Sequence, residues 1–451
     1  MVSRAFIDAA VTGITMPRST FPLRKANRLL SRLDWHNPVH LMDALALLHD
    51  LASQTPIRIL QDYDGFAEDM LADGAADRAA RFVRGEVTLT QDSSDEDLLL
   101  DASRWLRTLE QAALEHGRFL VGDGEGDLED AWRTTDGRHY VIPRITPLRG
   151  ADDRNFSKRA LLYHRIVPAV IDTMAVRLHR VASAADAATV AREKLSRQRA
   201  YGAGFFPGLD VSIVHPGPRT FLVDGVSGFN ARALIEDHIR EARGKACVAV
   251  VWAELTMPDA HVEILQSVLA ESALDSLSAP RFLVAGSWHR PAGKKVRNIC
   301  RVLDGHGEAL FDVAKWAKFK FGGFTEAIEA GGELPLLVDE DHLSVIAICR
   351  DFLDRRAAAI PYGQLHVDVA IVPSMTPVIT DLKTVQGHAA TAQEMRIRFD
   401  TRTLVVAQPA TADKAAGAAV GQVLAFPEDP PAAANGEYVA GPWRICLLNP
   451  H

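Results

Sequence analysis

The segments CVAVVWAEL, residues 247–255, and LSVIAICRD, residues 343–351, decide the fold that this sequence predicts. Each is a short apolar run rich in β-branched residues. The first ends near Glu254 and the second near Cys349, so both runs stop at a side chain that can do chemistry. Continuous apolar runs of this length are typical of strands buried on both faces. We therefore expect two buried strands whose last residues project from a sheet edge.

Similar runs recur on both sides of these two segments. They are LDVSIVH (209–215), RFLVAGSW (281–288), VDVAIVPS (367–374) and TLVVAQP (403–409). Between the first two strands lies ARALIEDHIREARGK, in which Ala233, Ile235, Ile239 and Ala242 supply one apolar helix face. Strand–helix–strand alternation is typical of an α/β layered domain whose functional residues lie at strand ends. The sequence predicts such a domain over residues 208–451.

The first two hundred residues have a different pattern and predict a mainly helical domain over residues 1–200. Asn37 followed by Pro38 is a helix start, and Ser93 or Ser94 can cap a second helix that ends at Gly117. Residues 159–199 predict a third helix, kinked at Pro168. The glycine-rich segment YGAGFFPG, residues 201–208, is the expected domain boundary.

Composition limits the classes of function. A chain of 451 residues with 47% hydrophobic residues is long enough for two cores. The net charge of −8 argues against nucleic acid as a partner. No apolar run is long enough for a membrane helix or a signal peptide, and the four cysteines lack the spacing of a disulfide framework or a zinc site. We expect a cytoplasmic protein without a metal or another cofactor.

Three strand-end residue types fit thiol-dependent cleavage of an amide or nitrile. Such a reaction needs a nucleophile, a group that accepts its proton, and a positive group where negative charge develops on the substrate. Cys349 can supply the thiol at a strand-to-helix bend. Glu254, after an apolar strand, can supply the base. Lys318, between aromatic residues in AKWAKFKF, can supply the positive charge.

The words around these residues resemble the nitrilase superfamily, also called the carbon–nitrogen hydrolases. VVWAEL is similar to that family's segment around its glutamate, with Ala253 where proline is usual. FLVAGSW, Asn298 and LDGHGEAL resemble the stretches that precede its catalytic lysine. WAKFKF resembles the motif that contains this lysine, and the alignment matches the lysine to Lys318 and not to Lys315 or Lys320. ICRDF resembles the motif that contains the family's cysteine, with Arg350 where an aromatic residue is usual. VPSMTP resembles the segment that follows this cysteine motif.

The resemblance implies a four-layer αββα sandwich that forms homo-oligomers. It implies that Glu254 takes the proton of the Cys349 thiol, and that Lys318 with the backbone N–H of Arg350 holds the oxyanion of a thioester-forming step. A second glutamate would orient the lysine; Glu326 is the best match and Glu329 the reserve. The substrate would be a small amide, nitrile or acyl-amine.

Structural interpretations and other activities also fit the same residues. A cysteine at a strand end is often a packed apolar side chain, and a lone strand-end glutamate or lysine is often solvated. The same thioester could serve an N-acyltransferase, or the fold could belong to an interaction protein without turnover. The N-terminal half could cover the site, mediate assembly or bind a protein partner.

The basic stretch HRPAGKKVR, residues 289–297, also allows two interpretations. It is either a solvated loop or, through Lys294 and Lys295 together with Arg350, a contact surface for an anionic substrate.

Overall fold

The structure, a computed structural model, describes residues 37–86, 94–115, 128–144, 156–181, 198–271, 279–339, 342–354, 361–376, 382–412, 417–427 and 436–449. The chain divides into two compact units. Unit 1 comprises residues 1–119 and 150–162, and unit 2 comprises residues 120–149 and 163–451.

Unit 1 is helical in its described parts. Its elements are α2 (Pro38–Ser53), α3 (Ile57–Leu60), η3 (Gln61–Gly65), α4 (Glu68–Ala72), α5 (Ala75–Val83), α6 (Asp95–Glu115) and α8 (Phe156–Arg159). The Asn37 side chain accepts from Val39 N at 3.0 Å at the start of α2, and Ser94 Oγ accepts from Asp97 N at 3.2 Å at the start of α6. The two predicted helix starts at Asn37 and Ser94 are therefore confirmed; Ser93 and Gly117 lie outside the described residues.

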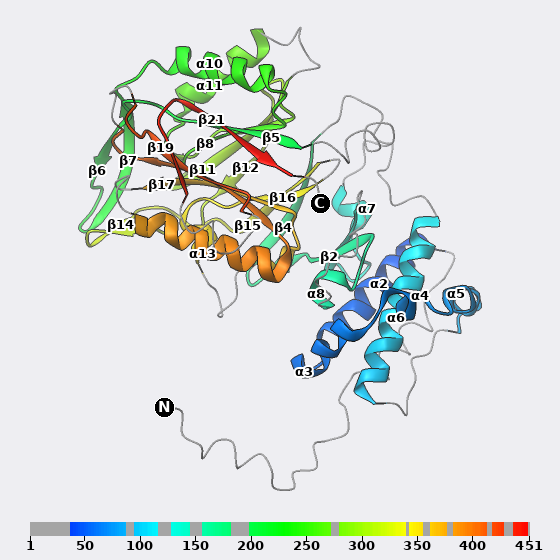
Figure 1. Ribbon diagram of the computed structural model, residues 1–451. Coiled ribbons are helices and arrows are strands. Elements are labelled where there is room, and N and C mark those ends of the chain that lie inside the picture. The colour runs from blue at the N-terminus through cyan, green and yellow to red at the C-terminus, as the bar shows by residue number, and fades with distance from the viewer. Residues whose placement is uncertain are drawn as a thin grey trace. The chain divides into compact units, whose positions relative to one another are not determined.

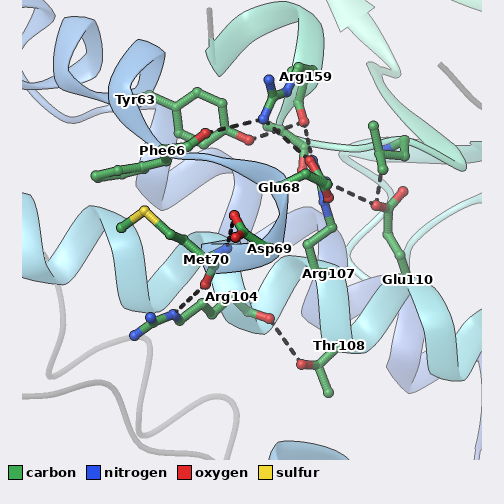
Figure 2. Close-up of polar contacts among 12 residues, drawn as sticks. Tyr63, Phe66, Glu68, Asp69, Met70, Arg104, Arg107, Thr108, Glu110 and Arg159 are labelled. Carbon is green, nitrogen blue, oxygen red and sulfur yellow. Dashed lines mark hydrogen bonds and ion pairs between the residues drawn. The ribbon is translucent and has the colours of Figure 1, made fainter. Parts of the chain in front are cut away.

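A charged cluster, in which Arg107 and Glu110 are buried and Glu68 is exposed, joins the elements of unit 1 (Figure 2). The Arg107 guanidinium donates to Glu68 at 2.7 Å and to the carbonyl oxygens of Arg159 and Ala160, each at 2.7 Å. Glu110 accepts from the backbone N–H of Leu162 at 2.9 Å. Because charge-assisted hydrogen bonds to buried carbonyls are strong and directional, these contacts hold the 156–162 segment against α6.

Unit 2 is built on two large sheets. A seven-stranded sheet contains β5 (Arg199–Gly204), β8 (Ala249–Trp252), β9 (Phe282–Val284), β10 (Trp288–Ala292), β11 (Lys295–Asp304), β12 (Ala309–Ala314) and β21 (Trp443–Leu448). An eight-stranded sheet contains β3 (Val170–Ile171), β4 (Met174–Arg180), β15 (Glu333–Val338), β16 (Leu343–Ile346), β17 (Val369–Thr376), β18 (Arg402–Pro409), β19 (Gly421–Ala425) and β20 (Glu437–Val439).

The sheets of unit 2 are packed face to face and covered by helices on their outer faces (Figure 1). Side chains from both sheets, such as Val251 and Ile346, share one apolar core between them. A second core joins the seven-stranded sheet to α10 (Ala231–Gly244) and α11 (Asp259–Glu271), and a third joins the eight-stranded sheet to α13 (Leu382–Phe399). The expectation of an α/β layered domain is confirmed.

Smaller elements complete unit 2. A four-stranded sheet has the order β13 (Lys320–Phe321), β14 (Phe324–Glu326), β7 (Thr220–Ser227) and β6 (Asp210–Val214). The strand β1 (His139–Pro143) pairs with β2 (His164–Pro168), and the short helices are α7 (Leu128–Trp132), α12 (Arg350–Leu353) and η5 (Pro361–Leu365). The run at 209–215 is a strand as predicted, but most of β6 is exposed rather than buried. Among the described helices, none is both long and apolar enough to cross a membrane.

The structure corrects the expected boundary at 201–208 and the helical assignment of residues 1–200. Strand β5 lies between β8 and β21, and β4 pairs in parallel with β15 over six residue pairs. Residues expected to continue the 159–199 helix form β2, β3 and β4 instead, while residues 182–197 lie outside the described residues. In β4 every second side chain is buried, and this period-two pattern outweighs helix propensity once a partner strand is present.

A buried ion pair also places β2 in unit 2. Arg165 of β2 approaches Asp368, just before β17, at 2.7 Å. Burial alone would raise the pKa of Asp368, but the Arg165 guanidinium overcomes this effect and lowers the pKa to about 2.

The corrected boundary predicts how fragments behave. A fragment of residues 208–451 lacks β4 and β5, so it would leave open edges on both large sheets and should lose cooperative unfolding. A fragment of residues 120–451 keeps both strands and should unfold cooperatively in urea. Circular dichroism and the urea slope of each fragment measure the difference. Cooperative unfolding of the shorter fragment with an undiminished slope would restore the boundary at 201–208.

Candidate active site

Cys349 lies at the bend between β16 and α12. Its backbone has φ 46° and ψ −101°, a conformation that costs energy for a residue with a side chain. The Cys349 N–H donates to the Pro373 carbonyl at 2.9 Å, and the Phe352 N–H donates to the Cys349 carbonyl at 3.2 Å. The bend predicted from the change of an apolar run into ICRD is therefore present, and backbone contacts hold it in place.

Glu254 lies in the loop that follows β8 and is buried. The next residue, Leu255, has a positive φ of 56°, and its N–H donates to Ser287 Oγ at 3.2 Å. The neighbouring loop approaches so closely that a Cβ on Gly286 would lie 2.4 Å from the Ala253 carbonyl oxygen. Glycine at 286 therefore allows the loops after β8 and β9 to pack together around the carboxylate.

Lys315, directly after β12, joins the carboxylates of the site. Its ammonium lies 2.7 Å from Glu254 Oε1 and 2.8 Å from Glu326 Oε2. All three side chains are buried. Although burial opposes its charged form, Glu254 and Glu326 raise the pKa of Lys315 well above its ordinary value. In turn Lys315 and His289 lower the pKa of Glu326 against the effect of burial. The group is thus an ammonium ion bound by two carboxylates.

This geometry corrects the assignment of Lys318. The side chain of Lys318 is exposed, whereas Lys315 is buried between the two glutamates. Lys315 follows its strand directly, as Glu254 and Cys349 closely follow theirs, so the strand-end criterion selects it. The alignment of WAKFKF with the family's lysine segment was wrong by three residues, because it relied on the aromatic residues and not on the end of the strand.

Two further side chains, on neighbouring strands, bind the glutamates. Asn298 of β11 donates from Nδ2 to Glu254 Oε1 at 3.0 Å and to Glu326 Oε1 at 2.9 Å. His289 of β10 pairs across the sheet with Asn298 and places Nε2 3.0 Å from Glu326 Oε1. The Val223 N–H of β7 donates to His289 Nδ1 at 2.8 Å, which assigns the imidazole proton to Nε2.

The two glutamates differ in how fully their oxygens are occupied. Glu326 accepts from His289 and Asn298 at Oε1, and from Lys315 and the Phe319 N–H at Oε2. Glu254 accepts from Lys315 and Asn298 at Oε1 and from the Met375 N–H at Oε2, at 3.2 Å, and its carboxylate is also a hydrogen-bond partner of the Cys349 thiol. Glu254 Oε2 is therefore the carboxylate oxygen with room for another proton donor.

Asp351 connects the cysteine bend to the lysine segment. Its carboxylate accepts from the Ala317 N–H at 2.7 Å and from the Trp316 N–H at 3.1 Å. Both donors immediately follow Lys315. The aspartate thus fixes the backbone that carries the ammonium relative to the backbone that carries the thiol.

The thiol of Cys349 is protonated at neutral pH. Burial and the Glu254 carboxylate raise its pKa to about 12, against the opposing effects of Lys315 and the nearby Ser374 hydroxyl. A nucleophile in this state must lose its proton to a base as it attacks, because very little thiolate is present beforehand.

The other predicted residues lie apart from this cluster. The side chain of Arg350 is exposed, and Lys294 and Lys295 are exposed at the β10–β11 turn. Lys295 pairs with Glu329 at 2.6 Å, so Glu329 is engaged at the surface while Glu326 binds Lys315. Of the two candidates, Glu326 contacts Lys315, whereas Glu329 pairs with Lys295 and Arg297.

His289 and Asp351 are functional candidates that the sequence reasoning did not single out. His289 was treated as part of a basic loop, although it lies on a strand opposite Asn298. Within the described part of the chain, no group of three or more histidine, cysteine, aspartate or glutamate side chains is arranged to bind a metal ion.

Comparisons with known proteins give structural neighbours. No family model and no curated protein matches the chain. Among solved structures, an amidase from Nesterenkonia sp. is 15% identical, covering 56% of this chain and 90% of its own, with a TM-score of 0.39. A cysteine-to-alanine mutant of the Nesterenkonia AN1 amidase, described as from the nitrilase superfamily, is 14% identical with the same coverages and TM-score.

The stability of variants distinguishes Lys315 from Lys318. Lys315→Met leaves two carboxylates buried without their cation and should lower the free energy of unfolding by about 3–5 kcal/mol near neutral pH. Lys318→Met, an exposed matched control, should change it by less than about 0.5 kcal/mol. Urea denaturation of both variants measures these changes, and equal effects would contradict the assignment.

The same variant should depend on pH in a defined direction. The pKa of Glu326 is lowered from its ordinary 4.5, so its contribution to stability is complete above that value and is lost as pH falls below it. Without Lys315 this contribution is missing. The difference between wild type and Lys315→Met should therefore be largest near neutral pH and shrink on acidification.

Proposed function

We propose that this protein is a thiol-dependent carbon–nitrogen hydrolase that acts on small amides. The observation that carries the proposal is the Lys315 ammonium, hydrogen-bonded to Glu254 and Glu326 beside the strained bend of Cys349. A protonated thiol, a carboxylate with a free acceptor position and a fixed cation are the three groups that acyl transfer through a thioester requires.

The proposed reaction has two halves. Glu254 Oε2 takes the proton of the Cys349 thiol as sulfur attacks the carbonyl carbon, and the Lys315 ammonium with the Arg350 backbone N–H stabilises the oxyanion. Glu254 returns the proton to the leaving nitrogen, the C–N bond breaks and ammonia or an amine departs. Glu254 then takes a proton from water, the hydroxyl attacks the thioester, and the carboxylic acid leaves as the thiol re-forms.

Glu326 has a positioning role in this scheme. Its four hydrogen bonds and its lowered pKa keep it ionised, so it orients Lys315 instead of accepting a proton. Lys315 has three N–H donors and gives two of them to the described carboxylates, which leaves the third for the substrate oxygen.

Alkylation of Cys349 tests the proposal directly. We expect 2-chloroacetamide to modify Cys349 faster than Cys247, Cys300 or Cys446, because its amide group can bind where the substrate amide binds. Glu254→Gln and Lys315→Met should each slow this reaction at least tenfold, while Lys318→Met should leave it unchanged. Peptide mass spectrometry gives the rate at each cysteine, and insensitivity to both Glu254→Gln and Lys315→Met would reject the mechanism.

Turnover of simple amides is the second test. Ammonia release from acetamide or propionamide should be abolished by Cys349→Ala, and Lys315→Met should lower kcat by about 10²–10³ because one oxyanion donor is lost. An acyltransferase would be favoured if the acyl group is transferred to an added amine and if no ammonia and carboxylic acid form when the amine is left out.

His289 should affect the pH profile as well as the rate. Its Nε2–H helps to lower the pKa of Glu326, so His289→Leu should raise that pKa and move the acid limb of kcat/KM to higher pH. His289→Gln keeps an N–H donor and should restore part of the wild-type profile. A fall in rate without a shift of the acid limb would indicate a purely structural role.

A further inference from the structure

Four phenylalanines share one face of the four-stranded sheet with Glu326. Across β13 and β14, Phe321 lies opposite Phe324, and across β14 and β7, Glu326 lies opposite Phe221. Alternate residues of a strand point to the same side, so Phe324 and Glu326 share a face with their cross-strand partners. Phe319, two residues before Phe321, bonds to Glu326 through its N–H. Figure 1 shows β6, β7 and β14 together at one edge of unit 2.

The aromatic rings lead from the candidate site to the surface. The Lys315 ammonium lies 5.9 Å from the centre of the Phe319 ring. Phe319 meets Phe221 edge-on at 6.5 Å and stacks on Phe321 at 6.4 Å with 9° between the ring planes. Phe319 is partly exposed and Phe321 is 58% exposed. We define Phe221, Phe319 and Phe321 as the aromatic strip.

The exposed end of the aromatic strip lies at the tight turn that joins β13 and β14. Gly322 and Gly323 have φ of 55° and 84°, the pair of positive values that a two-residue hairpin of the favoured twist requires. Phe321 and Phe324 directly flank this turn, and both are large apolar side chains left exposed. Apolar surface that continues from a reactive centre is a typical feature of ligand sites.

Two basic residues of the 289–297 stretch are already paired with an acidic side chain. Lys295 and Arg297 pair with Glu329, at 2.6 Å and 2.9 Å. The electron-rich faces of phenylalanine rings repel carboxylates and attract apolar planar groups. The surroundings of Lys315 therefore fit an uncharged aromatic substituent better than an acidic one.

We propose that the aromatic strip binds a planar apolar group of the substrate, so that aryl- or arylalkyl-substituted amides are preferred to short aliphatic amides and to anionic amides. The inference rests on the proposed function, since it assumes that the substrate carbonyl oxygen lies at Lys315. The strip then selects the substituent on one side of that carbonyl, either the acyl group or the leaving amine.

Paired alkylating amides test this preference at Cys349 without requiring turnover. On the amine side, N-benzyl-2-chloroacetamide is compared with N-methyl-2-chloroacetamide. On the acyl side, 2-chloro-2-phenylacetamide is compared with 2-chloropropionamide. Each rate is divided by the rate with free glutathione, which removes intrinsic reactivity. We expect the aryl reagent of at least one pair to be favoured about tenfold, the magnitude of a good aromatic contact.

Variants assign the preference to the strip. Phe321→Ala should reduce the aryl-to-alkyl ratio to near one, and Phe319→Leu should reduce it as well. Tyr438→Ala, which removes an exposed aromatic ring from β20, is the matched control and should keep the wild-type ratio. Normalised ratios near one for both pairs in the wild type, or an aryl preference that survives Phe321→Ala, would overturn the inference.

The same measurements separate this inference from the proposed function. Dependence of the N-methyl reagent on Glu254 and Lys315, together with ratios near one, would leave the hydrolase in place and reject the aromatic strip. The opposite result is an aryl preference that depends on Phe321, while alkylation by N-methyl-2-chloroacetamide is unaffected by Glu254→Gln and Lys315→Met. It would support the strip as a binding surface and reject the catalytic mechanism.

Discussion

The contact on which the candidate site depends is the Lys315 ammonium between Glu254 and Glu326. Two buried carboxylates at this separation would repel each other, and a buried ammonium alone would lose its proton. Together they form an arrangement with one net negative charge and a defined geometry. The two glutamates differ through their other partners, because Glu326 also accepts from His289 and the Phe319 N–H, whereas the Glu254 carboxylate also contacts the Cys349 thiol.

This arrangement requires elements that are far apart in the sequence to meet. Lys315 follows β12 and Glu254 follows β8 in the seven-stranded sheet, Cys349 follows β16 in the eight-stranded sheet, and Glu326 ends β14 in the small sheet. His289 of the seven-stranded sheet connects it to the small sheet, since its Nδ1 accepts from β7 while its Nε2 reaches Glu326 of β14. A displacement of the small sheet would change a hydrogen bond of the lysine directly. A displacement of the eight-stranded sheet would change the Met375 contact with Glu254 and the Asp351 contacts with the backbone after Lys315, so the face-to-face packing of the sheets is part of the site.

Local sequence was sufficient for features that depend on neighbouring residues. The cap at Asn37, the helix over residues 231–244 and the apolar strands before Glu254 and Cys349 follow from capping and periodicity alone. It was insufficient for β4 and β5, whose place is fixed by pairing with β15 and β8. In β4 the alternating apolar residues Met174, Val176 and Leu178 are a strand signature that the helical interpretation did not use, whereas the glycine-containing β5 has no such alternation, and so the boundary was placed too late.

The lysine error has a different physical origin from the boundary error. Three lysines fall within six residues, at 315, 318 and 320, and composition cannot distinguish them. Position relative to the strand can, because Lys315 directly follows β12 and is buried against the glutamates, whereas Lys318 and Lys320 are exposed. The criterion that selected Glu254 and Cys349, a reactive side chain at the end of an apolar strand, identifies Lys315 as well. Position relative to a strand end is thus a stronger guide to this site than the identity of the surrounding aromatic residues, which serve the adjoining face of the small sheet.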